Sequence, residues 1–202
     1  VAAVLKGWGG QKLIDSYDIE RRPVAWDIVN EAARNYNQFA KLPTSNEIRL
    51  ADQGSQKLRD SIGSIIYREK FNREYDMEGV PLGYCYEGSP IISSDGTRAQ
   101  PFEVMKYHPT ARPGHRAPHA WLNDGRSILD LYGRGFTLLC FDKAIDISSI
   151  LEAALERRMP IAIENIDNDA ISKLYGRKLV LVRPDGHVAW RNDSSPEIAG
   201  NL

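Results

Sequence analysis

The order of apolar segments near the carboxyl end constrains the fold of this chain more than any other feature. Residues 136–141 and residues 160–164 are short, almost continuously apolar runs, which is typical of strands buried on both faces of a sheet. Between them, residues 147–158 carry apolar side chains at helical spacing. Two strands joined through a helix predict a β-α-β unit.

A β-hairpin pattern follows this unit. Residues 178–183 and residues 187–191 are two further strand patterns, and Pro-Asp-Gly at 184–186 is a turn sequence between them. A β-α-β unit followed by a hairpin is the order of a thioredoxin-like domain, whose closing helix would begin in residues 195–202. A smaller hairpin is expected around the Asn-Asp-Gly turn at 123–125.

The amino-terminal part has the pattern of long helices. Residues 11–39 predict one amphipathic helix, and Pro23 inside it should kink the helix or divide it in two. Capping-box spacing at residues 44–47 precedes a second helical pattern. On the face of the first helix that we expect to be buried lie Leu13, Ile14, Tyr17, Arg21, Val24, Ala25, Ile28, Val29, Ala32, Ala33 and Tyr36; on that of the second lie Leu58, Ile62, Ile65, Ile66 and Phe71.

These patterns divide the chain into three parts and predict the α+β class. Residues 1–75 form a helical section and residues 113–202 a thioredoxin-like α/β domain without a C-x-x-C motif. Residues 76–112, rich in Gly, Pro and Tyr, predict an extended linker with at most one short strand, because X-Pro steps favour extended backbone.

Composition excludes several classes of partner. The net charge of −1 gives no electrostatic basis for binding nucleic acid or an anionic membrane. No apolar stretch approaches the roughly 20 residues that a membrane span needs. The two cysteines, Cys85 and Cys140, lie far apart; a disulfide between them is one alternative, and two reduced thiols in the cytoplasm is the one we expect.

The first residues have the pattern of a helix end. Residues 1–5 are an apolar run with no Ser, Thr, Asp or Asn before them to cap a helix. We therefore expect this chain to be the C-terminal piece of a larger protein.

Three stretches, in order, carry a resemblance that covers nearly the whole chain. They are residues 13–25 with the run Glu-Arg-Arg-Pro-Val-Ala; Leu-Gly-Tyr at 82–84 and Ser-Pro at 89–90 together with Pro-Gly-His-Arg-Ala-Pro-His-Ala-Trp-Leu at 113–122; and Val-Arg-Pro-Asp-Gly-His-Val-Ala-Trp-Arg at 182–191. In these stretches the chain resembles the FAD-dependent aromatic-ring monooxygenases, in particular the phenol hydroxylase and dichlorophenol monooxygenase branch.

The resemblance implies a parent protein that binds FAD, takes electrons from NADH or NADPH, and uses O₂ to hydroxylate an aromatic, usually phenolic, ring. This chain contains no G-x-G-x-x-G after a strand, which a dinucleotide-binding loop requires. We therefore expect residues 1–75 to be a remnant of the flavin and substrate region, and the chain alone to bind no FAD and to be inactive. Its expected role is structural or in subunit contacts, with the FAD-binding domain as partner and a homodimer as a further possibility.

We assign no catalytic, cofactor-binding or metal-ligating residue. His115 and His119 are four residues apart, but Pro113 and Pro118 oppose the helix that would align their rings. We expect these two histidines, with His108 and His187, to make hydrogen bonds rather than to bind a metal.

Several other side chains have two readings. Tyr84, Tyr86 and Trp121 either line an aromatic pocket or pack at the domain junction. Glu20, Arg21 and Arg22 could fasten the first helix to a neighbour that this chain lacks. For Glu20 and Arg22 the alternative is a solvated charged face, and Asp18 and Arg22 are spaced to pair at i,i+4.

Cys140 is the basis of the alternative function. A stand-alone thioredoxin-like binding or redox module would use its thiolate. However, no second cysteine lies nearby, so an inert buried thiol is the expectation.

Overall fold

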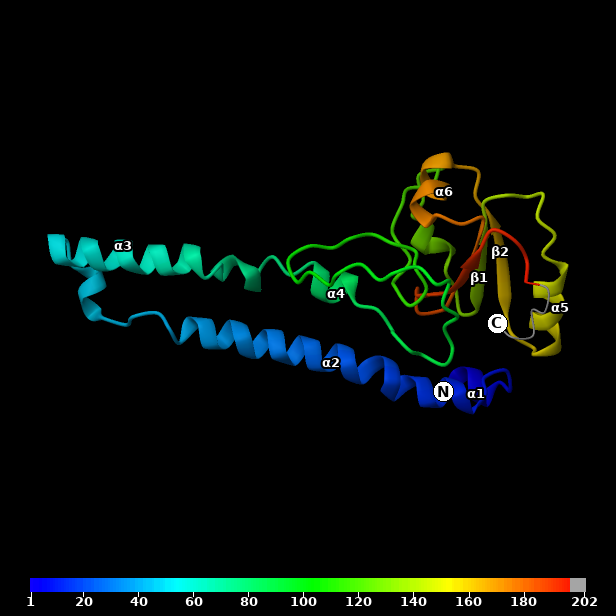
Figure 1. Ribbon diagram of the computed structural model, residues 1–202, viewed down its shortest axis with the longest axis horizontal. Helices are drawn as coiled ribbons and strands as arrows, with labels where there is room; N and C mark the ends of the chain where they lie inside the picture. Colours follow the sequence, from blue (N-terminus) through cyan, green and yellow to red (C-terminus); the bar gives the residue numbers. More distant parts are fainter. Residues whose placement is uncertain (197–202) are drawn as a thin grey trace.

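The computed structural model describes residues 1–196, and these form an arm and a sheet region. The helices α2 (Gln11–Phe39) and α3 (Gln53–Arg68) run in opposite directions along the arm, which projects away from the sheet (Figure 1). The short helix α1 (Ala2–Leu5) lies at the sheet end of α2, and the following Trp8 makes an edge-to-face contact with Phe136 on the sheet, with ring centres 6.3 Å apart. Within the described residues, no helix has both the length and the apolar character needed to cross a bilayer.

The sheet confirms the four predicted strands. They are β1 (Phe136–Cys140), β2 (Ile161–Asn165), β3 (Leu179–Val182) and β4 (Val188–Asn192), in the spatial order β2-β1-β3-β4. β1 pairs parallel with β2 and antiparallel with β3, and β3 pairs antiparallel with β4. The protein is thus a mixed α/β structure with a mixed sheet.

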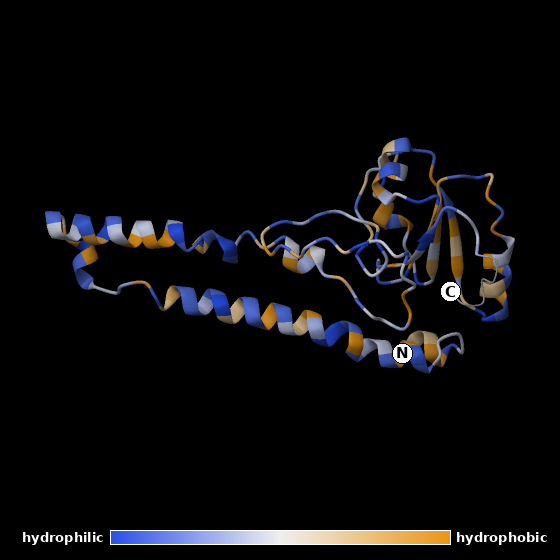
Figure 2. Cartoon of the chain, viewed as in Figure 1, coloured by the Kyte–Doolittle hydropathy of each residue, from blue (hydrophilic) through white to orange (hydrophobic). Residues whose placement is uncertain are grey.

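Both faces of the sheet are covered, which explains the continuously apolar strands. Leu138 on β1 faces the helix α5 (Ser148–Glu156), where it packs in one cluster with Ile150. The next residue, Leu139, belongs to the opposite cluster with Tyr175 on α6 (Asp169–Tyr175). Because successive side chains of a strand point to opposite faces, each central strand serves two cores. Figure 2 shows the strands as the most uniformly apolar segments of the chain.

Helix α6 is an element that the sequence reasoning missed. Its seven residues are too few to show helical periodicity, but its capping residues can be recognised in the sequence. Asn168 accepts hydrogen bonds from the backbone N–H groups of Ala170 and Ile171, and Gly176 ends the helix with φ of 70°. The predicted closing helix at 195–202 falls largely outside the described residues.

Helix α2 has the predicted bounds, and it is continuous through Pro23, so a division into two helices is wrong. The prediction of its buried face is also wrong. Only Val24 of the apolar positions is buried, whereas the buried stripe is mostly polar. That stripe consists of Ser16, Glu20, Val24, Asn35 and Gln38.

Polar contacts hold α2 against the chain that returns after α3. Arg73, in the 3₁₀ turn η2 (Phe71–Glu74), donates three hydrogen bonds to the Glu31 carboxylate, at 2.6, 2.9 and 3.1 Å. Phe39 and Phe71 meet edge to face at 5.2 Å. At the tip, Ser45 caps the 3₁₀ turn η1 (Asn46–Arg49), while Asp52 caps α3; the predicted capping box therefore starts a different, shorter element.

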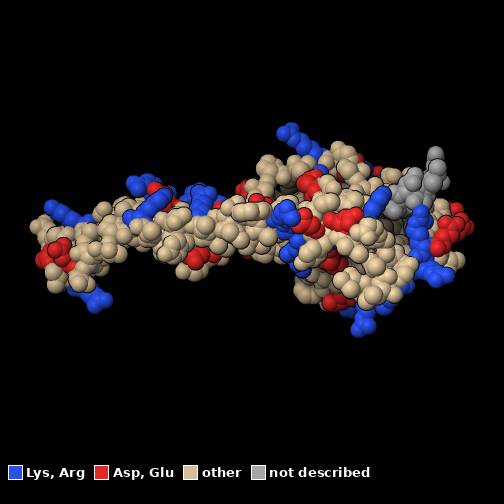
Figure 3. Space-filling model, turned by 90° about the horizontal axis from the view of Figure 1, so that it is seen from below, with Lys and Arg blue, Asp and Glu red and all other residues tan. Residues whose placement is uncertain are grey.

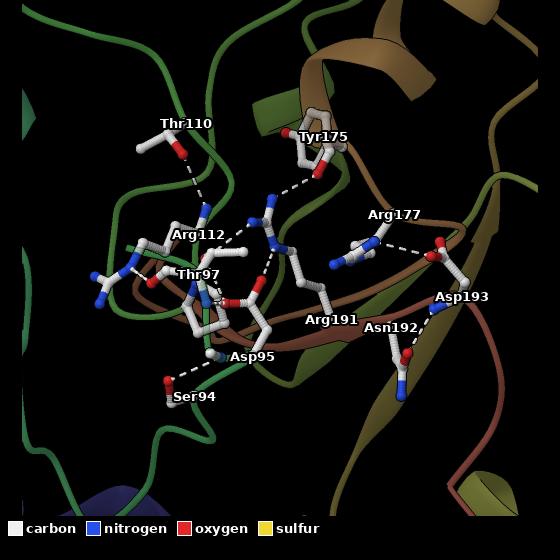
Figure 4. A network of polar contacts seen from close by, with 12 residues as sticks. Ser94, Asp95, Thr97, Thr110, Arg112, Tyr175, Arg177, Arg191, Asn192 and Asp193 are labelled. Carbon is white, nitrogen blue, oxygen red and sulfur yellow. Dashed lines mark hydrogen bonds and ion pairs between the residues drawn. The ribbon is translucent and has the colours of Figure 1, made fainter. Parts of the chain in front are cut away.

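The segment between arm and sheet is folded onto the sheet region. The prediction of extended chain with at most one short strand is wrong for α4 (Gly79–Gly83), a short helix. Farther along, Asp95 and Thr97 bond to Arg191 on β4, and Arg112 bonds to the carbonyl of Thr97 at 3.0 Å (Figure 4). Ser93 donates to the carbonyl of Ala189 at 2.9 Å, so this segment also adds backbone hydrogen bonds beside β4.

Candidate functional site

A buried ion pair joins the arm to the sheet. Arg183, directly after β3, donates to both oxygens of the Glu20 carboxylate on α2, at 2.6 Å from Nη1 to Oε1 and 3.0 Å from Nη2 to Oε2. The two side chains are 9% and 5% exposed. A bidentate guanidinium–carboxylate pair fixes both distance and orientation, so this contact sets how α2 meets the hairpin.

Further polar groups complete this contact. Ser89 donates to Glu20 Oε1 at 2.6 Å, and Arg183 donates to the Asp185 carboxylate at 2.6 Å. Arg21, the next residue on α2, donates to the hydroxyl of Tyr86 at 3.0 Å. Each buried charge therefore has charged or hydrogen-bonding partners, which burial of a charge requires. We call this cluster the α2–sheet joint: Glu20, Arg21, Tyr84, Tyr86, Ser89, Arg183, Asp185 and His187.

The joint contains a stack of planar groups. The Arg183 guanidinium lies 5.4 Å from the centre of the Tyr86 ring, within cation–π range. Tyr86 in turn stacks on His187 at 4.3 Å with an angle of 28° between the rings, and Tyr84 lies 5.3 Å from His187. Stacked planar groups pack closely and have few rotatable bonds, which limits the conformations open to these side chains.

A groove opens beside the joint. Its volume is about 260 Å³, and α2, α4 and the 99–110 loop surround it. Its walls include Val24, Tyr84 and Phe102, while His115 contributes an imidazole that is only 9% exposed. Burial and the nearby Arg112 charge lower the pKa of His115 to about 4, so this ring is neutral at pH 7. The groove thus offers mostly apolar contacts with a neutral imidazole at its edge.

The lowered pKa of His115 makes stability depend on pH. Its pKa is about 4 when folded and 6.5 ordinarily, so the unfolded chain binds the extra proton and stability falls as the pH drops from 6.5 to 4. We expect this group to account for a loss of about 2 kcal/mol, since solvent at the edge of the groove screens part of the full effect. The groups facing the ring include Arg112, Glu87, His187 and Arg191.

Urea unfolding at pH 4 and pH 6.5 measures this loss. In His115→Asn the free energy of unfolding should change less between pH 4 and pH 6.5. The same substitution at the exposed His119 should leave the pH dependence as it is in the unmodified chain. Equal slopes in the unmodified chain and His115→Asn would contradict the assignment.

The two helix starts that follow a strand of the sheet do not fit the pyrophosphate of FAD. Such a site uses free N–H groups at a helix amino terminus after a strand. At α5, the first turn is already occupied because Asp146 accepts from the backbone N–H of Ser148 at 2.9 Å. At α6, the Asn168 side chain accepts from two backbone N–H groups, and Asp169 adds a negative charge. Both helix starts that follow a strand of the sheet are therefore closed to a phosphate.

The histidines and cysteines do not form a reactive cluster. His108 bonds to Glu103 at 2.8 Å, His119 packs on Trp121, and His115 and His187 lie in or beside the α2–sheet joint. Among residues 1–196, no group of three or more potential metal ligands comes together. The absence of catalytic, cofactor and metal residues from this chain stays a prediction.

Both cysteines are free thiols. Burial raises the pKa of Cys140, and burial and the charge of Glu87 raise that of Cys85 to about 12. A raised pKa disfavours the thiolate that redox chemistry needs. The alternative of a redox module therefore gains no support from Cys140.

The structure distinguishes between the two interpretations that the sequence allows for several side chains. Glu20 and Arg21 fasten α2 to the chain's own sheet region, while Arg22 pairs with Asp18 in solvent at 2.8 Å. Tyr84 and Tyr86 pack at this junction; Trp121 is 68% exposed and lies against His119 instead. Arg183 was not identified from the sequence as a functional candidate. The sequence feature that could have identified it is a charged residue directly after an apolar strand, where no opposite charge lies within the strand to pair with it.

Two family descriptions match opposite ends of the chain. Residues 110–202 match "Aromatic-ring hydroxylase, C-terminal", and residues 1–32 match "FAD binding domain". The ion pair of the α2–sheet joint connects the two matched stretches: Glu20 lies in the FAD-binding match and Arg183 in the C-terminal match.

Individual relatives match over nearly the whole chain. The FAD-dependent monooxygenase opdD of Penicillium oxalicum is 32% identical over 94% of this chain and 38% of its own length. The 2,4-dichlorophenol 6-monooxygenase of Cupriavidus pinatubonensis is 31% identical over 100% of this chain and 40% of its own. The solved structure of RebC soaked with chromopyrrolic acid superposes with a TM-score of 0.89 at 36% identity, covering 98% of this chain and 38% of RebC.

The chain thus spans less than half the length of each of these relatives. Its sequence and its fold both match theirs, and the C-terminal description covers the sheet region. Over nearly all of its length, the chain corresponds to the C-terminal part of the FAD-dependent aromatic-ring monooxygenases.

Proposed function

We propose that this chain acts as the C-terminal part of an FAD-dependent monooxygenase that hydroxylates a phenolic ring with NAD(P)H and O₂. Bound FAD would supply the redox chemistry. The chain's own residues would hold the flavin-binding part in place, through structure or subunit contacts. The relatives' printed names, which include a dichlorophenol monooxygenase, support the reaction class.

The observation that carries this proposal is the outward face of α2. Ile19, Trp26 and Val29, which share one side of the helix, are 43%, 60% and 56% exposed, although all three are large and apolar. An exposed apolar face of this kind marks a contact surface. It lies in the stretch matched by the FAD-binding description, which ends at residue 32, so its proposed occupant is the remainder of the FAD-binding domain. A second copy of the chain is the competing occupant.

The charge on the arm is consistent with an apolar contact. On the face shown in Figure 3, Lys, Arg, Asp and Glu atoms are scattered along the arm between broad uncharged areas. A contact that depends on apolar area rather than on a charged patch should persist at high salt.

The proposal also includes the domain boundaries, the cellular location and the fold type of the sheet region. The division into residues 1–75, 76–112 and 113–202 stays a prediction, as does a cytoplasmic location. We propose that residues 113–202 have a thioredoxin-like fold, which the β-α-β unit, the following hairpin and the parallel pairing of β1 and β2 support.

Activity of the flavin-loaded protein that carries this chain tests the proposal. Phenols should stimulate its NAD(P)H oxidation and yield ring-hydroxylated products detectable by mass. Trp26→Asp should lower flavin retention at least about tenfold, because a charge would be buried in the proposed contact. Leu155→Asp, which places the same charge at an exposed position of α5, should retain flavin normally. Oxidation that no aromatic compound stimulates would refute the reaction class, and equal flavin retention in the two variants would refute the contact.

A further inference from the structure

The α2–sheet joint connects regions of the chain that are far apart in sequence. Glu20 and Arg183 are separated by 163 positions, and each lies in a different family match. Elsewhere along α2, the contacts to the returning chain are farther toward the tip, at Glu31 and beyond. The pair is therefore a buried charged contact between the β3–β4 hairpin and the part of α2 that lies in the FAD-binding match.

The geometry of the pair makes it an orienting contact. The guanidinium engages both carboxylate oxygens of Glu20, its Nη2 also donates to Asp185, and the Tyr86 ring lies within cation–π range of it. Because each of these partners fixes the guanidinium plane, rotation of α2 about its axis would break several contacts at once. A lysine at the same position would keep the positive charge but could not donate the two parallel hydrogen bonds to the Glu20 carboxylate.

We propose that Arg183 is a positioning residue that, through Glu20, fixes the flavin-side half of α2 against the β3–β4 hairpin. The inference rests on the proposed function for its catalytic consequence, because only then does α2 abut a flavin-binding domain. A shifted α2 would let NAD(P)H electrons reduce O₂ to hydrogen peroxide instead of coupling O₂ to ring hydroxylation. Arg183 itself touches no reacting atom in this account.

Hydrogen exchange measured by mass spectrometry on this chain tests the positioning role directly. In Arg183→Met and Glu20→Gln, backbone amides of residues 16–27 should exchange about 100-fold faster, since removing one partner leaves the other charge buried. The amides of β1 and β3 should keep their protection. Arg183→Lys should lie between these variants and the unmodified chain.

Matched variants keep the test decisive. Asp18→Asn breaks the exposed pair with Arg22 on the same helix, and it should leave α2 exchange unchanged. Ser89→Ala removes one hydrogen bond to Glu20, and with it the bond that the hydroxyl accepts from the Ile91 N–H at 3.3 Å. It should accelerate α2 exchange about tenfold, and it decides the matter if Arg183→Met does not fold. Unchanged α2 exchange, or equal acceleration across α2 and the strands, would overturn the proposal.

The flavin-loaded protein separates this inference from the proposed function. Arg183→Met should at least halve the fraction of NAD(P)H oxidation that yields hydroxylated product, with peroxide accounting for the difference, and Asp18→Asn should not. Loosened α2 amides in a protein that never hydroxylates an aromatic ring would refute the proposed function and leave the positioning role standing. Unaltered coupling despite loosened amides would refute the catalytic consequence of positioning.

Discussion

Replacing Arg191 with Met is expected to lower the free energy of unfolding by about 3–5 kcal/mol. Arg191 lies on β4 with its side chain 11% exposed and donates to Asp95 at 2.7 Å and to the carbonyl of Tyr175 at 2.9 Å (Figure 4). Met can fill the space of the Arg stem but donates no hydrogen bond. The substitution leaves the Asp95 carboxylate, 7% exposed, without its counter-charge.

A second arginine in the same view provides the control. Arg177 pairs with Asp193 at 2.9 Å, but their side chains are 35% and 51% exposed. Arg177→Met should therefore cost less than about 1 kcal/mol. Urea unfolding of both variants at pH 7 measures the difference. Similar losses for the two would mean that burial of the Asp95–Arg191 pair does not tie residues 94–97 to the sheet.

The Leu138→Ala substitution is expected to cost about 2–5 kcal/mol. Leu138 is fully buried on β1, where it packs between the sheet and α5. Removing three carbon atoms there loses apolar burial and leaves a cavity that the paired strands on either side cannot close.

The matched change is Leu155→Ala on α5. This leucine is 80% exposed, so its truncation should alter stability by no more than about 0.5 kcal/mol. Thermal unfolding of the two variants, followed by circular dichroism, compares the same chemical change in two environments. A Leu138→Ala variant as stable as Leu155→Ala would show that the sheet is not the core of this region.

The sheet was predictable because its signals are local. Runs such as residues 179–182 are apolar on both faces, and the Pro-Asp-Gly turn at 184–186 determines the hairpin. Helix α6 was missed because its information lies in its caps, Asn168 and Gly176, rather than in a repeat.

The buried face of α2 was not predictable from periodicity. Periodicity finds the apolar stripe of a helix, but it does not say which chain covers that stripe. In this structure the polar stripe with Glu20 and Asn35 packs inward, and most of the predicted apolar positions, Ile28 among them, are exposed. The partner of Glu20 was equally hidden, because nothing local relates position 20 to Arg183. A pair separated by 163 positions becomes visible only once the fold brings them together.

The decisive measurement is the flavin content of this chain by itself. We propose that these residues position a flavin-binding domain and hold no flavin of their own, and the starts of α5 and α6, closed by Asp146 and Asn168, support this. The purified chain, incubated with excess FAD and then desalted, should show no flavin absorbance and should not oxidise NAD(P)H. One FAD retained per chain would contradict the account.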